Sequence, residues 1–367
     1  MRVRMSVFAS VMAGAFVLFT ATAALASGTV TTCDDAHLTT ALSGGGTVTF
    51  NCGAGPTTIT LATRKTISAA TTIDGGGLVT LDGGGAIGLF TVSGVSFTVQ
   101  NITLANGRTT ANGDGGAAIN SNGGAVTIDH STIFGNSTAN AGCGAIVVSG
   151  AALTITNSTM TGNHEDAAAQ AGLLCTNITA SLTMSDSTVA GNYSGTNGGG
   201  GAISTSGPAT FTNCTIANNT SHNDNGAVNA DGTVTFQDTI IANNPGGNCL
   251  SAGGSFVDGG HNLQYPGNSC GATITIADPL LLALANNGGP TQTMALQFGS
   301  PAIDAGNPAT CLATDQRGHA RIGVCDIGAI EFDPSAPGAT PIPTLGGRAI
   351  LLLAALLALL GALLIRR

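Results

Sequence analysis

The chain has 367 residues, and only 8% of them are charged, against about 25% in typical soluble domains. Its 55 glycines and its many small polar residues favour short strands joined by tight turns over helices. Residues 27–333 hold five basic residues against all 19 acidic ones. This balance excludes a nucleic-acid partner, because phosphate neutralisation needs a basic face.

Residues 1–26 have the pattern of a secretory signal peptide. Arg2 and Arg4 form a positive start, Val7 to Ala21 form an apolar run, and Ala24 to Ala26 form a small-x-small cleavage site. The sequence therefore predicts export across the inner membrane into an oxidising compartment, where cysteine pairs form disulfides.

The nine cysteines include no C-x-x-C motif, so neither a zinc site nor a thioredoxin-like motif is indicated. Close spacing predicts three disulfides: Cys33–Cys52, Cys249–Cys270 and Cys311–Cys325. Cys143 and Cys175 form a fourth, more widely spaced candidate pair. Cys214 is then the odd cysteine, and we expect it to be a buried thiol.

Internal repeats organise residues 27–277. Five segments align without gaps: VTIDHSTIFGN, LTITNSTMTGN, LTMSDSTVAGN, ATFTNCTIANN and VTFQDTIIANN. Their last residues follow one another in steps of 27, 29, 27 and 25: Asn136, Asn163, Asn192, Asn219 and Asn244. About three short strands fit into each unit, and this length is typical of one coil of a right-handed parallel β-helix. Residues 44–96 are interpreted as further, less regular coils.

Equivalent positions of successive coils should stack on one another. The expected interior stack is Ile128, Ile155, Met184, Phe211 and Phe236. A second column falls at a turn: Asn101, His130, Asn157, Asp186, Asn213 and Asp238. Asn and Asp suit turns because they tolerate left-handed geometry. We interpret this column and the later asparagine column as structural ladders, and we place Asp34 and Asp35 in an N-terminal cap.

Residues 278–333 differ from the repeats. They contain NGGPT, GSPAIDAG, DQRG and DIGAIE in that order, and together these blocks resemble the choice-of-anchor Q domain. The resemblance implies a segment that ends a β-helix surface protein before an anchoring signal. A capping role agrees with physics, since a solenoid exposes an open strand edge. We expect ion pairs of Arg317 and Arg321 with Asp315, Asp326 and Glu331 inside this cap.

The C-terminal residues predict a membrane anchor. Residues 334–348 form a linker rich in proline and glycine, and residues 349–367 form an apolar helix with a basic tail, Arg366 and Arg367. The tetrapeptide Ile342, Pro343, Thr344 and Leu345, with that helix and tail, resembles the IPTL-type sorting signal. The resemblance implies recognition and processing by an exosortase-like membrane enzyme.

Parallel β-helices also occur in polysaccharide-active enzymes. A lyase of this fold needs an Arg or Lys base and often calcium, and Arg108 lies six residues before Asp114 in a glycine-rich loop. That loop is either a calcium site or a solvated loop, and the latter is favoured. A glycosidase needs two facing carboxylates; Asp186 and Asp238 lie two coils apart, about 9.6 Å by coil spacing.

Two further clusters, His164-Glu165-Asp166 and His222-Asn223-Asp224, carry metal-ligand side chains. They lack H-x-x-x-H or H-E-x-x-H spacing, and we interpret them as decoration of insertion loops.

The sequence therefore predicts an all-β solenoid with a C-terminal cap, a signal peptide and one transmembrane helix. The favoured function is that of an exported, membrane-anchored or sorted cell-surface protein for adhesion, glycan binding or structure. No cofactor or metal is predicted, although calcium stays open. Expected partners are the membrane, a processing enzyme and a polysaccharide or host-surface ligand. The alternative is a polysaccharide lyase or glycoside hydrolase of the pectate-lyase-like fold.

Overall fold

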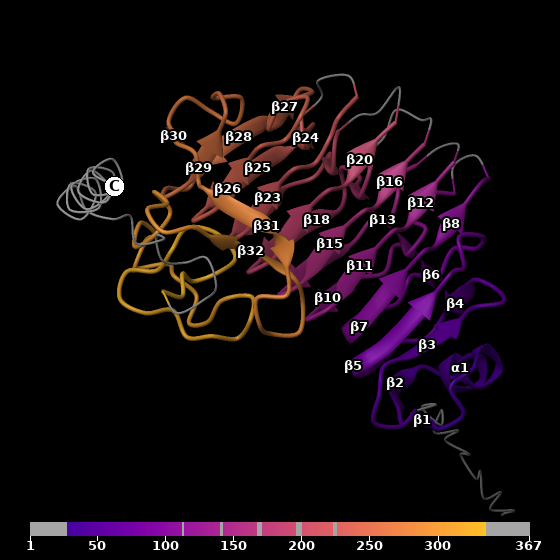
Figure 1. Ribbon diagram of the computed structural model, residues 1–367. Coiled ribbons are helices and arrows are strands. Elements are labelled where there is room, and N and C mark those ends of the chain that lie inside the picture. The colour runs from indigo at the N-terminus through magenta and orange to yellow at the C-terminus, as the bar shows by residue number, and fades with distance from the viewer. Residues whose placement is uncertain are drawn as a thin grey trace, which may run out of the picture.

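The computed structural model is a right-handed parallel β-helix, and the short helix α1 (Asp35–Leu42) follows its first strand in the chain. It describes residues 28–111, 114–139, 142–166, 171–195, 200–222 and 226–334. Figure 1 shows the strands stacked in coils along one axis, with the segment after the last coil lying against one side.

Each regular coil contributes one strand to each of three long faces. Face 1 contains β1 (Gly28–Val30), β2 (Gly46–Phe50), β5 (Thr71–Asp82), β7 (Phe97–Ala105), β10 (Val126–Asp129), β14 (Ala152–Thr156), β18 (Ser181–Ser185), β22 (Ala209–Thr212), β25 (Thr233–Gln237) and β28 (Ser255–Asp258). Face 2 contains the second halves of β5 and β7 together with β3 (Thr57–Thr60), β11 (Thr132–Phe134), β15 (Thr159–Thr161), β19 (Thr188–Ala190), β23 (Thr215–Ala217), β26 (Ile240–Ala242), β29 (Leu263–Tyr265) and β30 (Thr275–Ile276).

Face 3 and a short fourth sheet complete the coils. Face 3 contains β4 (Lys65–Ile67), β6 (Phe90–Ser93), β9 (Ile119–Asn122), β13 (Ile146–Ser149), β17 (Leu174–Thr176), β21 (Ile203–Thr205), β24 (Val228–Ala230) and β27 (Cys249–Ser251). The fourth sheet contains β8 (Arg108–Thr109), β12 (Ser137–Thr138), β16 (His164–Glu165) and β20 (Tyr193–Ser194). The strands of neighbouring coils pair in parallel, as the repeat pattern predicts.

The predicted interior stack is confirmed. On face 1, Ile128 pairs with Ile155, Ile155 with Met184, Met184 with Phe211 and Phe211 with Phe236. All five side chains are fully buried. Period-2 alternation turns these apolar residues inward, because successive side chains of a strand point to opposite faces.

The predicted turn column is confirmed as well. All its members have a left-handed backbone, with φ between 41° and 51°: Asn101, His130, Asn157, Asp186, Asn213 and Asp238. Asn and Asp accept this geometry at low cost. The later asparagine column points inward instead, where each side chain bonds to the next coil, as between Asn163 and Asn192 (Nδ2 to Oδ1, 2.9 Å).

The predicted N-terminal cap is present. Asp34 is the N-cap of α1 and accepts the backbone N–H of His37, and Leu38 and Leu42 of the helix are buried in the core. All four cysteine pairs are disulfide-bonded, and Cys214 is a buried free thiol. These predictions are therefore confirmed.

Residues 278–334, called the C-terminal segment below, pack on the side of the solenoid over face 2 (Figure 1). Its hairpin, β31 (Leu281–Ala285) with β32 (Thr293–Leu296), is antiparallel. Met294 packs against Ala190 and Ala217, and Thr291 Oγ1 donates to the carbonyl oxygen of Asn157, 3.1 Å away. The sequence suggested a cap for the open end, and it did not predict this coverage along the side.

Candidate functional site

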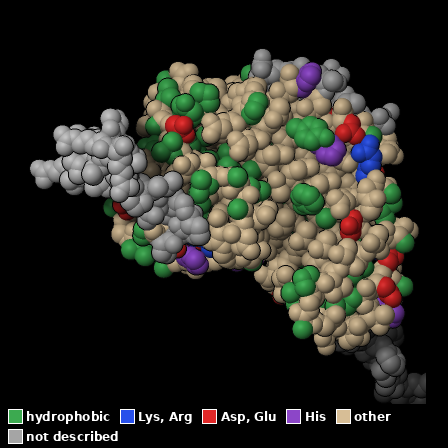
Figure 2. All heavy atoms as spheres, in the orientation of Figure 1, with side chains coloured by type: hydrophobic (Ala, Val, Ile, Leu, Met, Phe, Trp, Pro, Cys, Tyr) green, Lys and Arg blue, Asp and Glu red, His purple; other side chains and the backbone are tan. Residues whose placement is uncertain are grey.

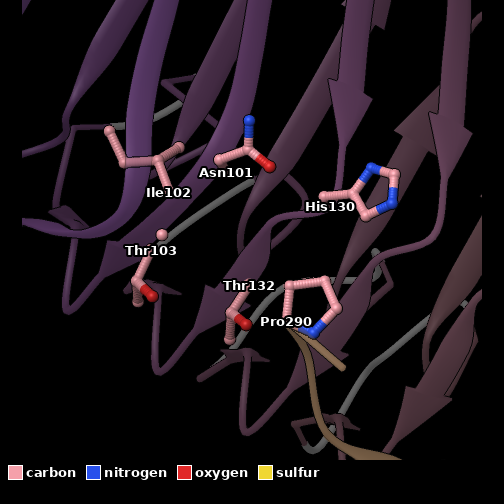
Figure 3. Close-up of a pocket in the computed structure, with 7 residues that line it drawn as sticks. Asn101, Ile102, Thr103, His130, Thr132 and Pro290 are labelled. Atoms are coloured by element: carbon pink, nitrogen blue, oxygen red, sulfur yellow. The ribbon is translucent and has the colours of Figure 1, made fainter. Parts of the chain in front are cut away.

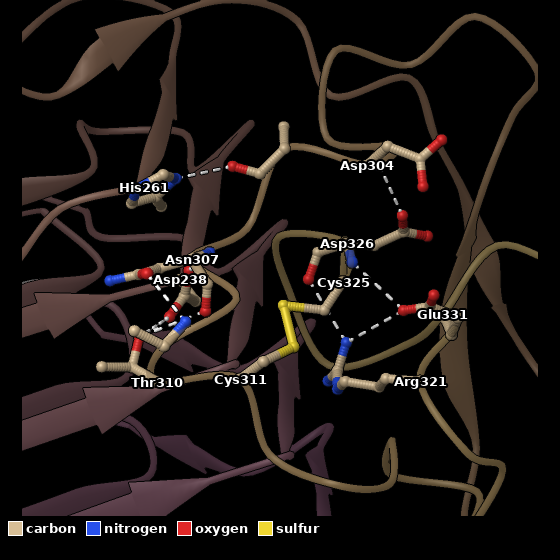
Figure 4. The surroundings of a disulfide bond; sticks show 12 residues. Asp238, His261, Asp304, Asn307, Thr310, Cys311, Arg321, Cys325, Asp326 and Glu331 are labelled. Carbon is tan, nitrogen blue, oxygen red and sulfur yellow. Dashed lines mark hydrogen bonds and ion pairs between the residues drawn. A yellow bond between two sulfur atoms is a disulfide. The ribbon is translucent and has the colours of Figure 1, made fainter. Parts of the chain in front are cut away.

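The two aspartates that the sequence suggested as weak catalytic candidates hold the C-terminal segment in place. Asp186 lies 2.8 Å from Arg321, Oδ1 to Nη2, and both side chains are buried. Asp238 accepts the backbone N–H of Asn307 at 2.7 Å and the hydroxyl of Thr310 at 3.0 Å (Figure 4). Both aspartates are buried, and their contacts bind the segment to the turn column.

Arg321 connects this contact to the polar core of the segment. Its guanidinium also lies 3.5 Å from Glu331, and Asp326 Oδ1 accepts the backbone N–H of Asp304 at 2.7 Å (Figure 4). Arg317 pairs with Asp315 at 2.6 Å. The expected pairs of Arg317 with Asp315 and of Arg321 with Glu331 are therefore present, and Asp186 of the solenoid joins them. The Asp326 carboxylate differs from the expectation, because it accepts backbone N–H groups rather than an arginine.

Burial raises the pKa values of two of these acids. Burial raises the pKa of Asp186 to about 6, against the opposing charge of Arg321. Burial likewise raises the pKa of Asp326 to about 6, against the N–H groups of Asp304 and Phe332. A raised pKa is typical of a general acid, but Asp186 is only 6% exposed and its Oδ1 is bonded to Arg321.

Arg108 and Asp114, suggested together as a possible calcium loop, face different partners. Arg108 pairs with Asp166 at 2.8 Å, whereas Asp114 pairs with Arg64 of an earlier coil. Across the described ranges, no group of three or more His, Cys, Asp or Glu is placed to hold a metal ion.

A small polar pocket lies where Pro290 of the C-terminal segment meets the solenoid. Figure 3 shows Asn101, His130 and Thr132 around it, on the side facing Pro290. Its free volume of about 20 Å³ accommodates about one water molecule. Burial raises the pKa of the neighbouring Asp129, but hydrogen bonds from three neighbours outweigh it and leave that pKa below its ordinary value. An ionised carboxylate cannot donate a proton, so this place is unsuited to a general acid.

A larger hollow of about 210 Å³ lies beside α1 and is lined by Arg64 and Lys65. Lys65 forms an ion pair with Asp35, and Arg64 is bound to Asp114. Both cations are thus neutralised by protein carboxylates, and a free anion would have to displace them.

The best candidate site is a column of outward-facing residues, here called the outer column. Each member follows the inward asparagine position of its coil: Arg108, Ser137, His164, Tyr193, Thr220 and Pro245. The rings of His164 and Tyr193 stack at 4.6 Å and 6°. Figure 2 shows a hydrophobic, a histidine, an acidic and a basic side chain gathered on this face, over the strands labelled β20, β16 and β8 in Figure 1.

Polar contacts fix the start of the outer column. Arg108 donates to Ser137 Oγ at 2.9 Å and to Asp166 at 2.8 Å. His164 Nε2 lies 3.3 Å from the other oxygen of Asp166. The result is a charge-balanced pair beside two stacked rings, a combination that suits recognition of a polar ligand with an apolar face.

A Ser-His-Asp arrangement for acyl transfer does not result. His164 Nδ1 lies 3.5 Å from the carbonyl oxygen of Gly162, and its Nε2 faces Asp166. Ser137 Oγ receives an N–H from Arg108. No ring nitrogen is therefore directed at the hydroxyl as a base, which a nucleophile requires.

The outer column was not predicted from the sequence, because the cluster at His164 was interpreted as decoration of an insertion loop. The structure places His164 and Glu165 in β16, paired in register with β12 and β20. The available signal was the position after the last residue of each repeat, where Arg108 follows Gly107, His164 follows Asn163 and Tyr193 follows Asn192. His222 lies in the same loop region but outside the column.

The predicted signal peptide at residues 1–26 and the predicted C-terminal features at residues 335–367, with the sorting tetrapeptide at 342–345, Arg366 and Arg367, lie outside the described residues. Within the described ranges, no helix has the length and apolar character needed to cross a membrane.

No family model matches this chain, and no curated protein matches it. Among solved structures, the chain is similar to one described as the crystal structure of pectate lyase Pel9A. The two are 14% identical, with a TM-score of 0.37, over 78% of this chain and 88% of that chain. The β-helix is defined by the strand pairing of this chain itself. The resemblances to the choice-of-anchor Q domain and the IPTL-type signal stay predictions.

Proposed function

We propose that this chain is an exported cell-surface β-helix protein that serves adhesion or glycan binding rather than catalysis. The outer column carries the proposal: it places stacked rings and a charge-balanced pair on a disulfide-linked scaffold. Four disulfides agree with an oxidising compartment. The role needs no cofactor or metal, and its partner is a polysaccharide or a host surface.

The predicted N-terminal and C-terminal segments would determine where the protein is located. Residues 1–26 would direct export, and residues 349–367 would hold the body outside the membrane until an exosortase-like enzyme recognises Ile342 to Leu345. Surface labelling of intact cells with a membrane-impermeant reagent tests this location. We expect labelling of the chain, and a variant lacking residues 342–367 should move into the medium. Labelling only after lysis would contradict the proposal.

The alternative is a polysaccharide lyase or glycoside hydrolase, and it requires carboxylates that reach a glycosidic bond. Asp186 and Asp238 are instead bonded to the C-terminal segment. The test incubates the full-length protein with plant, algal and bacterial polysaccharides, with and without calcium. We expect no new reducing ends and no absorbance of unsaturated uronates. Release from any substrate would overturn the non-enzymatic assignment.

A further inference from the structure

We infer that the outer column binds an uncharged pyranose ring of a neutral polysaccharide, seated over Thr220 between Tyr193 and Pro245. The inference deepens the proposed glycan-binding function and rests on it.

Tyr193 is 43% exposed although one face of its ring is covered. His164 covers that face, and the two rings are nearly parallel at 4.6 Å. This separation is close to the spacing between neighbouring coils, about 4.8 Å. The plane of the Tyr193 ring is therefore roughly perpendicular to the solenoid axis. The opposite face is directed to the next coil. The side chain there is Thr220, which pairs with Tyr193, is exposed, and is too small to continue the stack.

The coil spacing leaves room for about one ring over Thr220. Pro245 follows Asn244 as Thr220 follows Asn219, and it is exposed. Tyr193 and Pro245 are therefore two coils apart, about 9.6 Å, and a ring midway would lie about 4.8 Å from each. That is within the range in which rings stack. A pyranose places its C–H face against the negative face of an aromatic ring, which is favourable for the same electrostatic reason.

The polar groups of the outer column add no net charge to it. Thr220 contributes a hydroxyl to the proposed seat, and on the His164 side of the ring stack Arg108 is balanced by Asp166. Residues 27–333 carry 19 acids against five bases, and such a body repels polyanions. Uncharged hexoses therefore fit the column better than uronates.

The test uses the full-length chain in a detergent without a sugar headgroup. The chain has two tyrosines and no tryptophan, so in a Tyr265→Phe variant its tyrosine fluorescence comes from Tyr193 alone. This variant is titrated with neutral gluco-, manno- and galacto-oligosaccharides and with uronate oligomers. We expect a saturable change with at least one neutral series, and at least tenfold weaker binding of the uronates.

Site variants decide whether the outer column is responsible. Thr220→Phe fills the proposed seat with a ring of the protein's own, and Tyr193→Ala removes its wall. Both should weaken binding at least tenfold by calorimetry, with an unchanged thermal midpoint. Phe298→Ala is the matched control, because it removes another exposed aromatic side chain, in the C-terminal segment, and it should bind as the parent does.

Several results would overturn the inference. They are binding that survives Thr220→Phe or Tyr193→Ala, preferential binding of uronates, and no binding of any neutral series. The inference would also be overturned if the site bound a protein instead, that is, if the chain bound a protein ligand and the Thr220→Phe variant lost that binding. Failure of the proposed surface location is a separate result, because sugar binding is measured on the purified chain and surface labelling on intact cells.

Discussion

Single polar side chains decide whether the buried polar groups of this solenoid have hydrogen-bond partners. Asn192 shows the arrangement: its Oδ1 accepts the backbone N–H and the Nδ2 of Asn163, and its own Nδ2 donates to Asn219 and to the carbonyl oxygen of Met160. The side chain is buried, so no water replaces these bonds. A ladder of this kind stabilises the coils mainly because leaving it incomplete is costly.

Asn192→Ala should lower the free energy of unfolding by about 3 kcal/mol, since it leaves several buried polar groups without partners. Chemical denaturation followed by circular dichroism measures the change. Thr210→Ala, on an exposed position of β22, is the control and should stay within about 0.5 kcal/mol of the parent. Equal effects of the two variants would argue against the ladder.

Cys214 takes a ladder position that hydroxyl residues occupy in neighbouring coils. Its thiol donates to the carbonyl oxygens of Met184 and Thr212, both at 3.4 Å, and burial raises the pKa of the thiol far above its ordinary value. We expect no alkylation by a maleimide in the native state and one labelled thiol in denaturant. Cys214→Ser should fold with a stability within about 1 kcal/mol of the parent. Rapid native labelling would contradict the burial.

The buried acids predict a pH dependence with a definite sign. Asp186 and Asp326 have a folded pKa of about 6, above the ordinary value of 3.8. The folded state therefore binds protons more readily, so the free energy of unfolding should fall as pH rises from about 4 to 6, and then level off. Each group contributes at most about 3 kcal/mol. Denaturation at several pH values measures the slope, and Asp186→Asn should make it shallower; an unchanged slope would exclude Asp186 as a source.

At the scale of elements, the C-terminal segment is fastened by polar contacts at defined coils. Gln316 has its amide between Thr159 and Thr188 of neighbouring face 2 strands, at 2.8 and 2.6 Å, and Arg321 reaches Asp186 of the turn column. On β19 and β23 the residues that contact the segment are threonine or alanine, and these small side chains leave room for it to approach: Thr188, Ala190, Thr215 and Ala217. The segment therefore docks in one register along the axis.

Arg321→Ala should loosen this docking, because it leaves Asp186 and Glu331 buried without their cation. Breaking a buried ion pair in this way costs about 3–5 kcal/mol. Limited proteolysis should then cut within residues 278–334 at least tenfold faster, while the coils stay intact. The double variant Arg321→Met with Asp186→Leu removes both charges and should recover most of the resistance. Unchanged proteolysis in Arg321→Ala would refute the role of this contact.

At the scale of the whole molecule, a coil is stabilised by its two neighbours, and an end coil has only one. Cys33–Cys52 closes the first coil beneath α1, and Cys249–Cys270 lies in the last coils. Loops of this length contribute about 3 kcal/mol in the chain-entropy account. These two disulfides thus support the ends of the solenoid, where stacking is weakest.

Replacing Cys33 and Cys52 by serine should therefore fray the start of the solenoid before its middle. Hydrogen exchange should rise at least tenfold in β1 and β2 and stay unchanged in β14 and β18. The same replacement of Cys249 and Cys270 serves as the mirror-image control, with fraying at the last coils. Uniform acceleration along the chain would show that the coils unfold as one unit.

The fold was largely predictable because a solenoid is a local pattern repeated. Period-2 alternation turned Ile128 inward, the step of about 27 residues set the coil, and Asn157 marked a left-handed turn. The outer column was harder to predict. Its members are about one coil apart in sequence and differ chemically, so only the register between coils makes Arg108, His164 and Tyr193 neighbours.

The sequence by itself determined the repeat, the interior stack, the turn column and the cysteine pairs, because each depends on short-range periodicity or on spacing along the chain. Only the tertiary structure decided what Asp186 and Asp238 do. Their partners Arg321 and Thr310 are 135 and 72 residues away, and they meet because the C-terminal segment folds back over face 2. That contact is long-range packing, which no local pattern encodes. Because of it, the two aspartates suggested as catalytic candidates instead hold the C-terminal segment on the solenoid.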